Sequence, residues 1–239
     1  PKYYPRNAGP TTSLVIEDLK NGADPIAAGM QGRRYGRGTS NGASMRVAAA
    51  GLTAVGDREK AIANAVAMSR PTHGTQHACS GACAIACGVT EALKEDADVL
   101  SIVQACLYGA RRGEEIGLAA ARRASGCSTV RCIERAVAAA LPHEDMPSAL
   151  DAIEYEVGNG VAIQESVAAA IAIFMAAHGD VEKTILGGAN IGGDSDTIAC
   201  MAGSVAAAFF GIPKDIREAA QPFLEGEVKR VYQAFIQRY

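Results

Sequence analysis

The amino-acid sequence predicts an all-α protein, and three observations support that fold class. No stretch of the 239 residues alternates apolar and polar positions with β-branched side chains, as strands do. Helix-breaking residues recur at helix-length intervals, and apolar residues repeat at helical spacing between them. Hydrophobic residues make up 49% of the chain but aromatic residues only 5%. We therefore expect a core of small and aliphatic side chains, which lets helices approach closely.

The first half of the chain contains four predicted helices separated by Gly- and Pro-rich segments. Thr11 and Thr12 are expected to cap the first helix, and Asn21-Gly22 to end it. Pro71 to Gly74 interrupt the chain before a long Ala- and Cys-rich helix. The expected helices span residues 13–19, 45–52, 58–69 and 75–93, with loops at 1–10 and 29–42.

The second half continues the helical pattern. Asp96 or Asp98 is expected to cap a helix that starts near Val99, and Ser148 with Asp151 has the spacing of a capping box. Residues 164–177 are apolar on nearly every side, which is typical of a buried central helix. The remaining helices are expected at 129–141, 181–186 and 198–211, in a short segment from Pro213, and through Val228, Val231, Tyr232 and Phe235. No linker is visible, so we expect one domain over residues 1–239.

Composition and charge exclude several classes of protein. The net charge is −3 and the pI is about 5.9, so the chain lacks the basic character of nucleic-acid-binding proteins. The longest strongly apolar run, residues 167–177, is too short to cross a bilayer. Seven cysteines, most of them within apolar helical segments, favour reduced thiols in a cytoplasmic protein without membrane association.

The cysteines at positions 79, 83 and 87 share one helix face. A metal or cluster site would need a ligand spacing that this pattern lacks. We therefore expect these three side chains to be small buried packing residues. His73 and His77 are four residues apart, but His73 precedes the helix, so we do not expect the pair to bind a metal.

The stretch from Gly192 to Thr197 is the strongest candidate for a site. Two glycines allow a tight turn, and Asp194, Asp196 and Thr197 then bring three oxygen-bearing side chains together where a helix begins. These are the ligands that Mg²⁺, Mn²⁺ or Ca²⁺ prefer. Helix capping by the same side chains is the alternative that the spacing alone favours, and the two interpretations are compatible.

A second candidate is the loop from Gly36 to Gly42. Its backbone N–H groups and the Ser40 hydroxyl are able to hold a phosphate. The alternative is a plain helix start with Ser40 or Asn41 as the cap. Arg46 has the charge to pair with a phosphate or with a carboxylate, and the sequence leaves both open.

Three separated blocks, taken together, resemble the ADP-ribosylglycohydrolase family. Residues 38–46, Gly-Thr-Ser-Asn-Gly-Ala-Ser-Met-Arg, resemble the family's G-x-S-N-G-x-x-M-R loop. Thr72-His73 resembles its T-H element, and residues 192–197, Gly-Gly-Asp-Ser-Asp-Thr, resemble its G-G-D-x-D-T metal motif. Residues 157–161 and 165–167 also resemble the family's segment before the central helix. The blocks follow the family's order.

The resemblance implies a fold, an activity and a set of site residues. The fold is an orthogonal multi-helix bundle that holds two divalent cations, Mg²⁺ or Mn²⁺. The activity is hydrolysis of the ribosyl C1″ bond of an ADP-ribosylated protein side chain or small molecule, which releases ADP-ribose. The implied metal ligands are Asp194, Asp196 and Thr197. The implied substrate site comprises Gly38, Ser40, Asn41, Gly42 and Arg46, with His73 and Val161 near the adenosine end.

One departure from the family pattern leaves the catalytic residues unassigned. The family has an N-terminal T-D-D metal motif, and no Thr-Asp-Asp occurs in this sequence. We therefore expect that the chain has lost an N-terminal segment or is inactive alone. Two alternatives stay open: a nucleoside or ribosyl-metabolite hydrolase, and a non-catalytic member that binds ADP-ribose or serves structurally. Tyr35, Tyr108 and Tyr155 are the candidates for stacking on an adenine.

Overall fold

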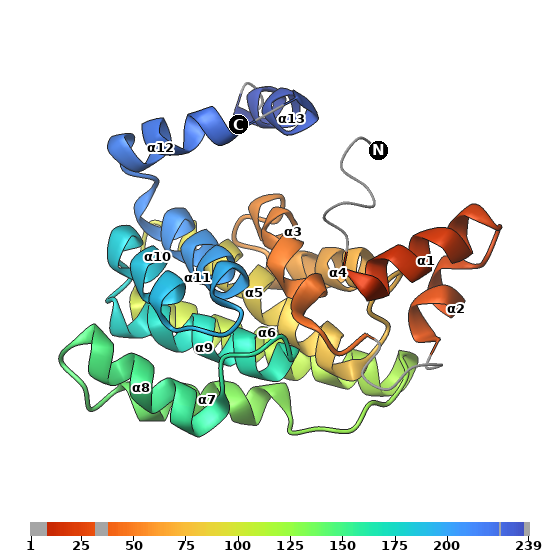
Figure 1. The fold of residues 1–239 in the computed structure, drawn as a ribbon, viewed down its shortest axis with the longest axis horizontal. Helices are drawn as coiled ribbons and strands as arrows, with labels where there is room; N and C mark the ends of the chain where they lie inside the picture. Colours follow the sequence, from red (N-terminus) through yellow and green to blue (C-terminus); the bar gives the residue numbers. More distant parts are fainter. Residues whose placement is uncertain (1–8, 32–37, 225, 237–239) are drawn as a thin grey trace.

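The chain is built from helices throughout the part that the computed structural model describes, which is residues 9–31, 38–224 and 226–236 (Figure 1). In those residues the backbone forms thirteen α-helices and two 3₁₀ helices, and extended pairing is confined to two isolated bridges. One bridge joins Ser40 to Ala162 and the other joins Thr75 to Arg122. The predicted all-α class is therefore confirmed.

The helices follow one another with short connections. In the first half they are α1 (Pro10–Lys20), α2 (Pro25–Met30), η1 (Asn41–Arg46), α3 (Ala48–Leu52), α4 (Arg58–Ser69), α5 (Gln76–Ala92) and α6 (Val99–Ala120). In the second half they are α7 (Thr129–Ala140), α8 (Met146–Val157), α9 (Ile163–Ala176), α10 (Val181–Asn190), α11 (Ser195–Phe210), α12 (Lys214–Ala220), η2 (Gln221–Phe223) and α13 (Gly226–Ile236).

Two helices form the centre of the core. All residues of α5 are buried, and α3, α4, α6, α9, α11 and η1 pack around it. The buried run Ser166–Met175 of α9 confirms the predicted buried helix. Cys79, Cys83 and Cys87 of α5 are fully buried, as expected of packing residues. Burial raises the pKa of the Cys87 thiol to about 12, so this thiol stays protonated at neutral pH.

Glycines allow α5 and α6 to approach closely. Gly109, Gly113 and Gly117 lie one turn apart on α6, on the side that faces α5. A Cβ on Gly113 would lie 2.4 Å from the Cys79 carbonyl oxygen, and one on Gly109 would lie 2.3 Å from the Cys83 carbonyl oxygen. Glycine disfavours a helix interior, so its three occurrences here are explained by the contact.

The caps differ from the predicted ones at two helices. Helix α1 begins at Pro10 with Gly9 as the N-cap and no side-chain cap bond, so the predicted capping by Thr11 and Thr12 is wrong. A proline suits the first turn because its missing N–H has no partner there. The predicted box of Ser148 and Asp151 is also wrong, because Asp145 caps α8 and Ser148 N–H is its donor.

The structure also shows which residues cap α2, α5 and α6 and where η1 ends and α3 begins. Asp98, not Asp96, caps α6, and Thr75 caps α5 from just outside it. The short α2 falls in a segment for which no helix was predicted, and Asp24 caps it. The expected helix at 45–52 is split: residues up to Arg46 belong to η1, and α3 begins at Ala48.

The C-terminal helices stand apart from the main body in Figure 1. Phe223 is 83% exposed and Val231 is 57% exposed, so this segment presents apolar side chains to solvent. Of the apolar face predicted for the last helix, Val228 and Phe235 lie outside the described side chains. Within the described residues, no helix combines the length and the apolar character needed to cross a bilayer.

Candidate functional site

Two glycines and one asparagine shape the turn that leads into α11. Gly192 and Gly193 have φ values of +82° and +57°, in the left-handed region that favours glycine. A Cβ on Gly193 would lie 2.3 Å from the backbone oxygen of Asn159. That oxygen accepts the Asp194 N–H at 2.8 Å, and the Asn159 side-chain amide donates to the Ile191 carbonyl at 2.8 Å. Asn159 therefore holds both ends of the turn.

The Asp194 carboxylate faces the η1 segment and does not cap its own helix. Asp194 occupies the N-cap position, but its side chain accepts no bond from the first turn. The Asn41 side-chain amide instead donates to Asp194 Oδ2. Asp196 Oδ1 accepts the N–H of the neighbouring Thr197 at 2.8 Å. The capping interpretation therefore fails for Asp194, and its carboxylate joins two segments that lie 153 positions apart.

The loop before η1 is held by the segment that precedes α9. Asn41 N–H donates to the Val161 carbonyl, and Ile163 N–H donates to the Thr39 carbonyl, both at 3.0 Å. The Val161 side chain is itself 56% exposed. These backbone bonds fix the position of Asn41, so its amide can reach Asp194.

A buried histidine lies directly behind Ser40. His73 is 1% exposed, and its Nε2 lies 3.0 Å from Ser40 Oγ. On the other side of the ring, Nδ1 lies 2.8 Å from Thr72 Oγ1, which also accepts a bond from Arg46 Nη2. Burial of the ring, with a smaller effect of the Arg46 charge, lowers the pKa of His73 to about 4. The imidazole is therefore neutral at pH 7.

Two further glycines make room for this histidine and its loop. Gly38 has a φ of +79°, and its carbonyl accepts a bond from Thr75 Oγ1 at 2.6 Å. A Cβ on Gly42 would lie 2.9 Å from His73 Nε2 and Cε1. Any other residue at position 42 would therefore press against the imidazole.

The structure brings most of the predicted site residues into two neighbouring groups. In the first group, Ser40 bonds to His73, and Gly38, Gly42 and Arg46 surround that pair. In the second group, Asn41 joins Asp194 to the Val161 backbone. Asp196 and Thr197 follow in the first turn of α11. Ser40 and Asn41 are adjacent, so the groups meet at one place.

Two residues of this arrangement received no role from the sequence. Thr72 stands in the Thr-His element and joins Arg46 to His73. Asn159 lies between two glycines, a pattern typical of a tight turn, and its backbone oxygen packs closely against Gly193. Arg46 lies 26 positions from Thr72, and Ile191 lies 32 positions from Asn159, which is why local sequence patterns did not reveal these roles.

The tyrosines predicted for adenine stacking have other contacts or lie outside the site. Tyr35 falls outside the described residues. The Tyr108 hydroxyl donates to Glu59 at 2.5 Å, and the Arg58 guanidinium lies 5.8 Å from the ring centroid. Tyr155 on α8 is 89% exposed. The described contacts of these rings therefore give no support to an adenine platform.

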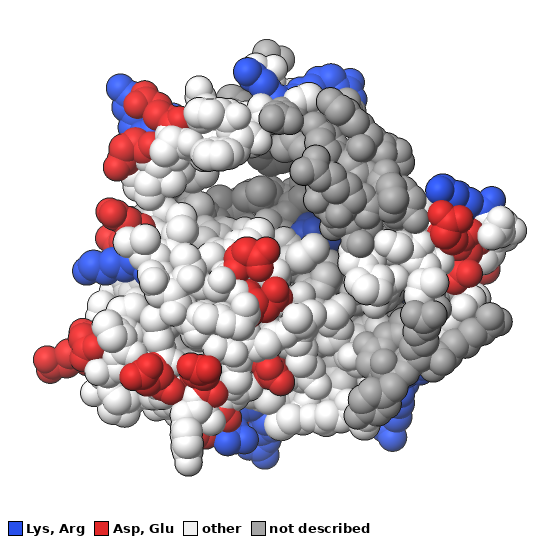
Figure 2. All heavy atoms as spheres, in the orientation of Figure 1, with Lys and Arg blue, Asp and Glu red and all other residues white. Residues whose placement is uncertain are grey.

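The charge on the face drawn in Figure 2 is mixed. Acidic side chains lie near the middle of this face, and most Lys and Arg side chains lie towards its margins. Such a pattern gives no single-sign field that would steer a polyanion.

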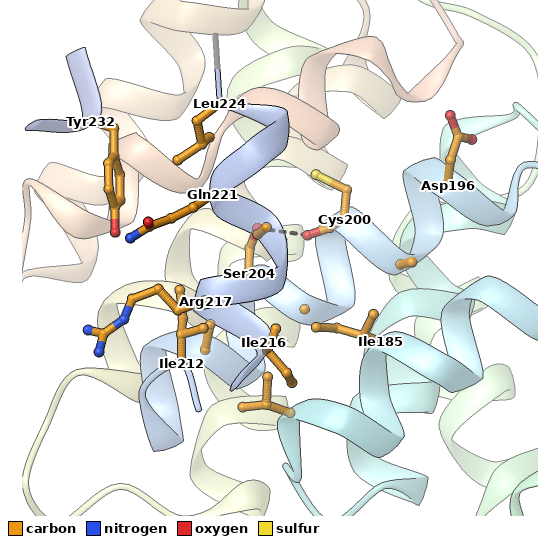
Figure 3. A pocket seen from close by; sticks show the side chains of 15 residues that line it. Ile185, Asp196, Cys200, Ser204, Ile212, Ile216, Arg217, Gln221, Leu224 and Tyr232 are labelled. Carbon is orange, nitrogen blue, oxygen red and sulfur yellow. Dashed lines mark hydrogen bonds between the residues drawn. The ribbon is translucent and has the colours of Figure 1, made fainter. Parts of the chain in front are cut away.

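An apolar cavity of about 480 Å³ borders the α11 side of the site (Figure 3). Its lining comes from α10, α11 and the C-terminal helices and includes Ile185, Ile212, Ile216, Leu224 and Tyr232. Asp196 lies at the edge of this group, and its carboxylate points away from the apolar side chains. The cavity therefore adjoins the first turn of α11, while the Asp196 carboxylate itself faces away from it.

Comparison with known proteins gives a match over nearly the whole chain. A model of the ADP-ribosylglycohydrolase family matches residues 2–239. The uncharacterized protein YegU of Escherichia coli (strain K12) is 29% identical over 232 residues, which are 97% of this chain and 65% of that protein.

Two further relatives match over shorter stretches. The human ADP-ribosylhydrolase ARH3 is 33% identical over 86 residues, which are 30% of this chain and 24% of the human protein. The ARH3 of Danio rerio is 42% identical over 67 residues, which are 24% of this chain and 18% of that protein. The chain spans less than two thirds of the length of these relatives.

Proposed function

The chain belongs to the ADP-ribosylglycohydrolase family, and from that membership we propose that it hydrolyses the C1″ bond of an ADP-ribosylated substrate and releases ADP-ribose. The family acts on ADP-ribosylated substrates and is commonly metal-dependent. The observation that carries the proposal for this chain is the bond from Asn41 to Asp194. It joins the expected substrate loop to the expected metal motif at one place.

The oxygen groups at the start of α11 have the chemistry of ligands for a divalent cation. Asp194 and Asp196 offer carboxylates and Thr197 offers a hydroxyl, a hard donor set that suits Mg²⁺ or Mn²⁺. Within the described residues, no three His, Cys, Asp or Glu side chains gather into a metal site. An ion held by Asp194, Asp196 and Thr197, and a second ion as well, would need further ligands beyond these residues. A bound ion would polarise a water and orient ribose hydroxyls.

The remaining residues have binding and orienting roles in this proposal. Departure of the group on C1″ develops positive charge on the ribose, so the substrate must be held close to the carboxylates. In this proposal Ser40 and Asn41 bind the diphosphate or ribose, which is supported by the bond from Asn41 to Asp194. Gly38, Gly42 and Arg46 fix that loop, and the exposed Val161 side chain lies beside it. No general base is assigned.

A non-catalytic, ADP-ribose-binding role is the second candidate. The small donor set is the observation that favours it, because a catalytic centre of this kind needs a base as well as metal ligands. Binding without hydrolysis would leave the same residues in the same places.

Release of ADP-ribose tests the proposal directly. We expect the chain with Mg²⁺ or Mn²⁺ to release ADP-ribose from ADP-ribosylated serine or arginine peptides, measured by chromatography. Asp194→Asn should reduce the rate at least 100-fold, because it removes a metal-binding charge. Asp215→Asn, which changes an exposed carboxylate in the first turn of α12, is the matched control and should leave the rate unchanged. No release from either peptide, combined with metal-dependent ADP-ribose binding, would favour the second candidate.

A further inference from the structure

Four side chains form a continuous hydrogen-bonded chain that ends at the site. Arg46 Nη2 contacts Thr72 Oγ1, and Thr72 Oγ1 lies 2.8 Å from His73 Nδ1. His73 Nε2 lies 3.0 Å from Ser40 Oγ. Ser40 is the partly buried end of this chain, and its hydroxyl makes no cap bond to η1.

The direction of the chain follows from its first member. A guanidinium is a donor and never an acceptor, so Thr72 Oγ1 accepts from Arg46. The single hydroxyl hydrogen of Thr72 has two acceptors in reach, His73 Nδ1 at 2.8 Å and the Ser69 carbonyl at 3.4 Å. The shorter contact is the stronger one. The Ser69 carbonyl already accepts the backbone N–H groups of Thr72 and His73.

The same charge disfavours a hydrogen on the near side of the ring. Arg46 already donates to Thr72 Oγ1. A hydrogen on His73 Nδ1 would point at the same oxygen, so the positive ends of two N–H groups would lie close together. The ring is neutral, so its one hydrogen then resides on Nε2. Nε2–H donates to Ser40 Oγ, and the Ser40 hydroxyl hydrogen is left to bond outward.

We propose that Arg46 and Thr72 are positioning residues that hold His73 as the Nε2–H tautomer and thereby make Ser40 a hydrogen-bond donor to the substrate. A donor at this place fits an oxygen that carries no hydrogen, such as an oxygen of a diphosphate. This ligand rests on the proposed function, whereas the direction of the chain does not. Gly42 supports the arrangement, because its missing Cβ lets the imidazole lie flush against η1.

Nitrogen NMR of the histidine ring tests the direction without any ligand. Long-range ¹H–¹⁵N spectra at pH 7 show which ring nitrogen is protonated, and loss of one set of signals in His73→Gln assigns His73 among the four histidines. We expect the hydrogen on Nε2. A hydrogen on Nδ1 in the wild-type protein would overturn the proposal, whether or not ADP-ribose binds.

Two variants at position 46 test the role of the guanidinium. Arg46→Met removes the donor and the charge at similar length, so the Nδ1–H tautomer should become populated. Arg46→Lys keeps a charged donor and should preserve the wild-type spectrum. An unchanged tautomer in a folded Arg46→Met protein would overturn the positioning role, with thermal melting by circular dichroism as the check on folding.

A binding measurement extends the test to Ser40. Ser40→Ala should weaken ADP-ribose by about 2- to 13-fold in calorimetry, which is the range for one hydrogen bond. Arg46→Met should weaken it in the same direction, and Arg46→Lys by less. Equal affinity in the wild type and Ser40→Ala would overturn the donor role of Ser40. Absence of ADP-ribose binding in the wild type would contradict the proposed function instead, and the NMR result would still decide the direction of the chain.

Discussion

Single residues without side chains determine much of the geometry of the site. A Cβ on Gly193 would lie 2.3 Å from the Asn159 carbonyl oxygen, and a Cβ on Gly42 would lie 2.9 Å from the His73 ring. Both positions let polar groups from distant segments meet. The carboxylate of Asp194 and the hydroxyl of Ser40 thus owe their places to neighbouring glycines.

The neutral, buried His73 makes folding stability depend on pH. Its pKa falls from 6.5 to about 4 on folding, so the unfolded chain binds more protons between those values. Stability from this residue is therefore complete above about pH 6.5 and is lost as the pH falls towards 4. Between pH 8 and pH 5 the contribution of His73 to the free energy of unfolding should fall by about 2 kcal/mol.

Urea denaturation of the wild type and His73→Gln at pH 8 and pH 5 measures this contribution of His73 to the free energy of unfolding. The wild type should lose about 2 kcal/mol more than His73→Gln between pH 8 and pH 5. His143→Gln, which changes an exposed histidine, should behave like the wild type. Equal losses in the wild type and His73→Gln would show that His73 is not buried in the neutral form.

At the scale of the helices, the contact between α5 and α6 holds the core together. The glycines at positions 109, 113 and 117 place backbone against backbone, and the thiols of α5 fill the remaining space. Helix α5 in turn follows directly after Thr72 and His73, with Thr75 as its cap. Displacement of α5 would therefore move the histidine as well.

Gly113→Ala tests this contact. An alanine would favour the helix by about 0.5–1 kcal/mol, but its methyl group would lie 2.4 Å from the Cys79 carbonyl oxygen. Overpacking of this kind costs about 1–3 kcal/mol or more, so the protein should lose stability. Gln104→Ala on the exposed side of α6 is the control and should change stability little. A gain of stability in Gly113→Ala, measured by urea denaturation, would contradict the close packing.

The sequence was informative about helices and less so about their ends. Local patterns predicted α4, α5, α7 and α9 because breakers and apolar spacing act over a few residues. The caps of α1 and α8 were wrong because several polar residues compete for each N-terminus and tertiary contacts select one. Helix α2 is a single short segment with a weak apolar pattern, so only its Asp24-Pro25 start carried a signal.

The site was predictable as a set of motifs and not as a geometry. The Gly-Gly-Asp and Gly-x-Ser-Asn blocks are readable in the sequence, but the bond from Asn41 to Asp194 spans 153 positions. The same holds for Thr72 and Asn159, whose partners lie in other segments. Long-range contacts follow from the packing of α5, α9 and α11, which no local pattern specifies.

For the whole molecule, the proposed site lies where the two halves of the chain meet. The η1 segment from the first half and α11 from the second both pack on α5, and the loop before α9 pairs with the loop before η1. The family model matches residues 2–239 and so includes both halves. The match covers 65% of the length of YegU and 24% of the length of human ARH3.

Calorimetric titration of ADP-ribose, with and without Mg²⁺, is the most direct test of the site. ADP-ribose is the product whichever acceptor is released, so it probes the site independently of the leaving group. We predict binding that requires Mg²⁺ in the wild type, is lost in Asp196→Asn, and is retained in Asp215→Asn. Binding of equal strength with and without Mg²⁺, or in the wild type and Asp196→Asn, would contradict a metal-dependent ADP-ribose site at the start of α11.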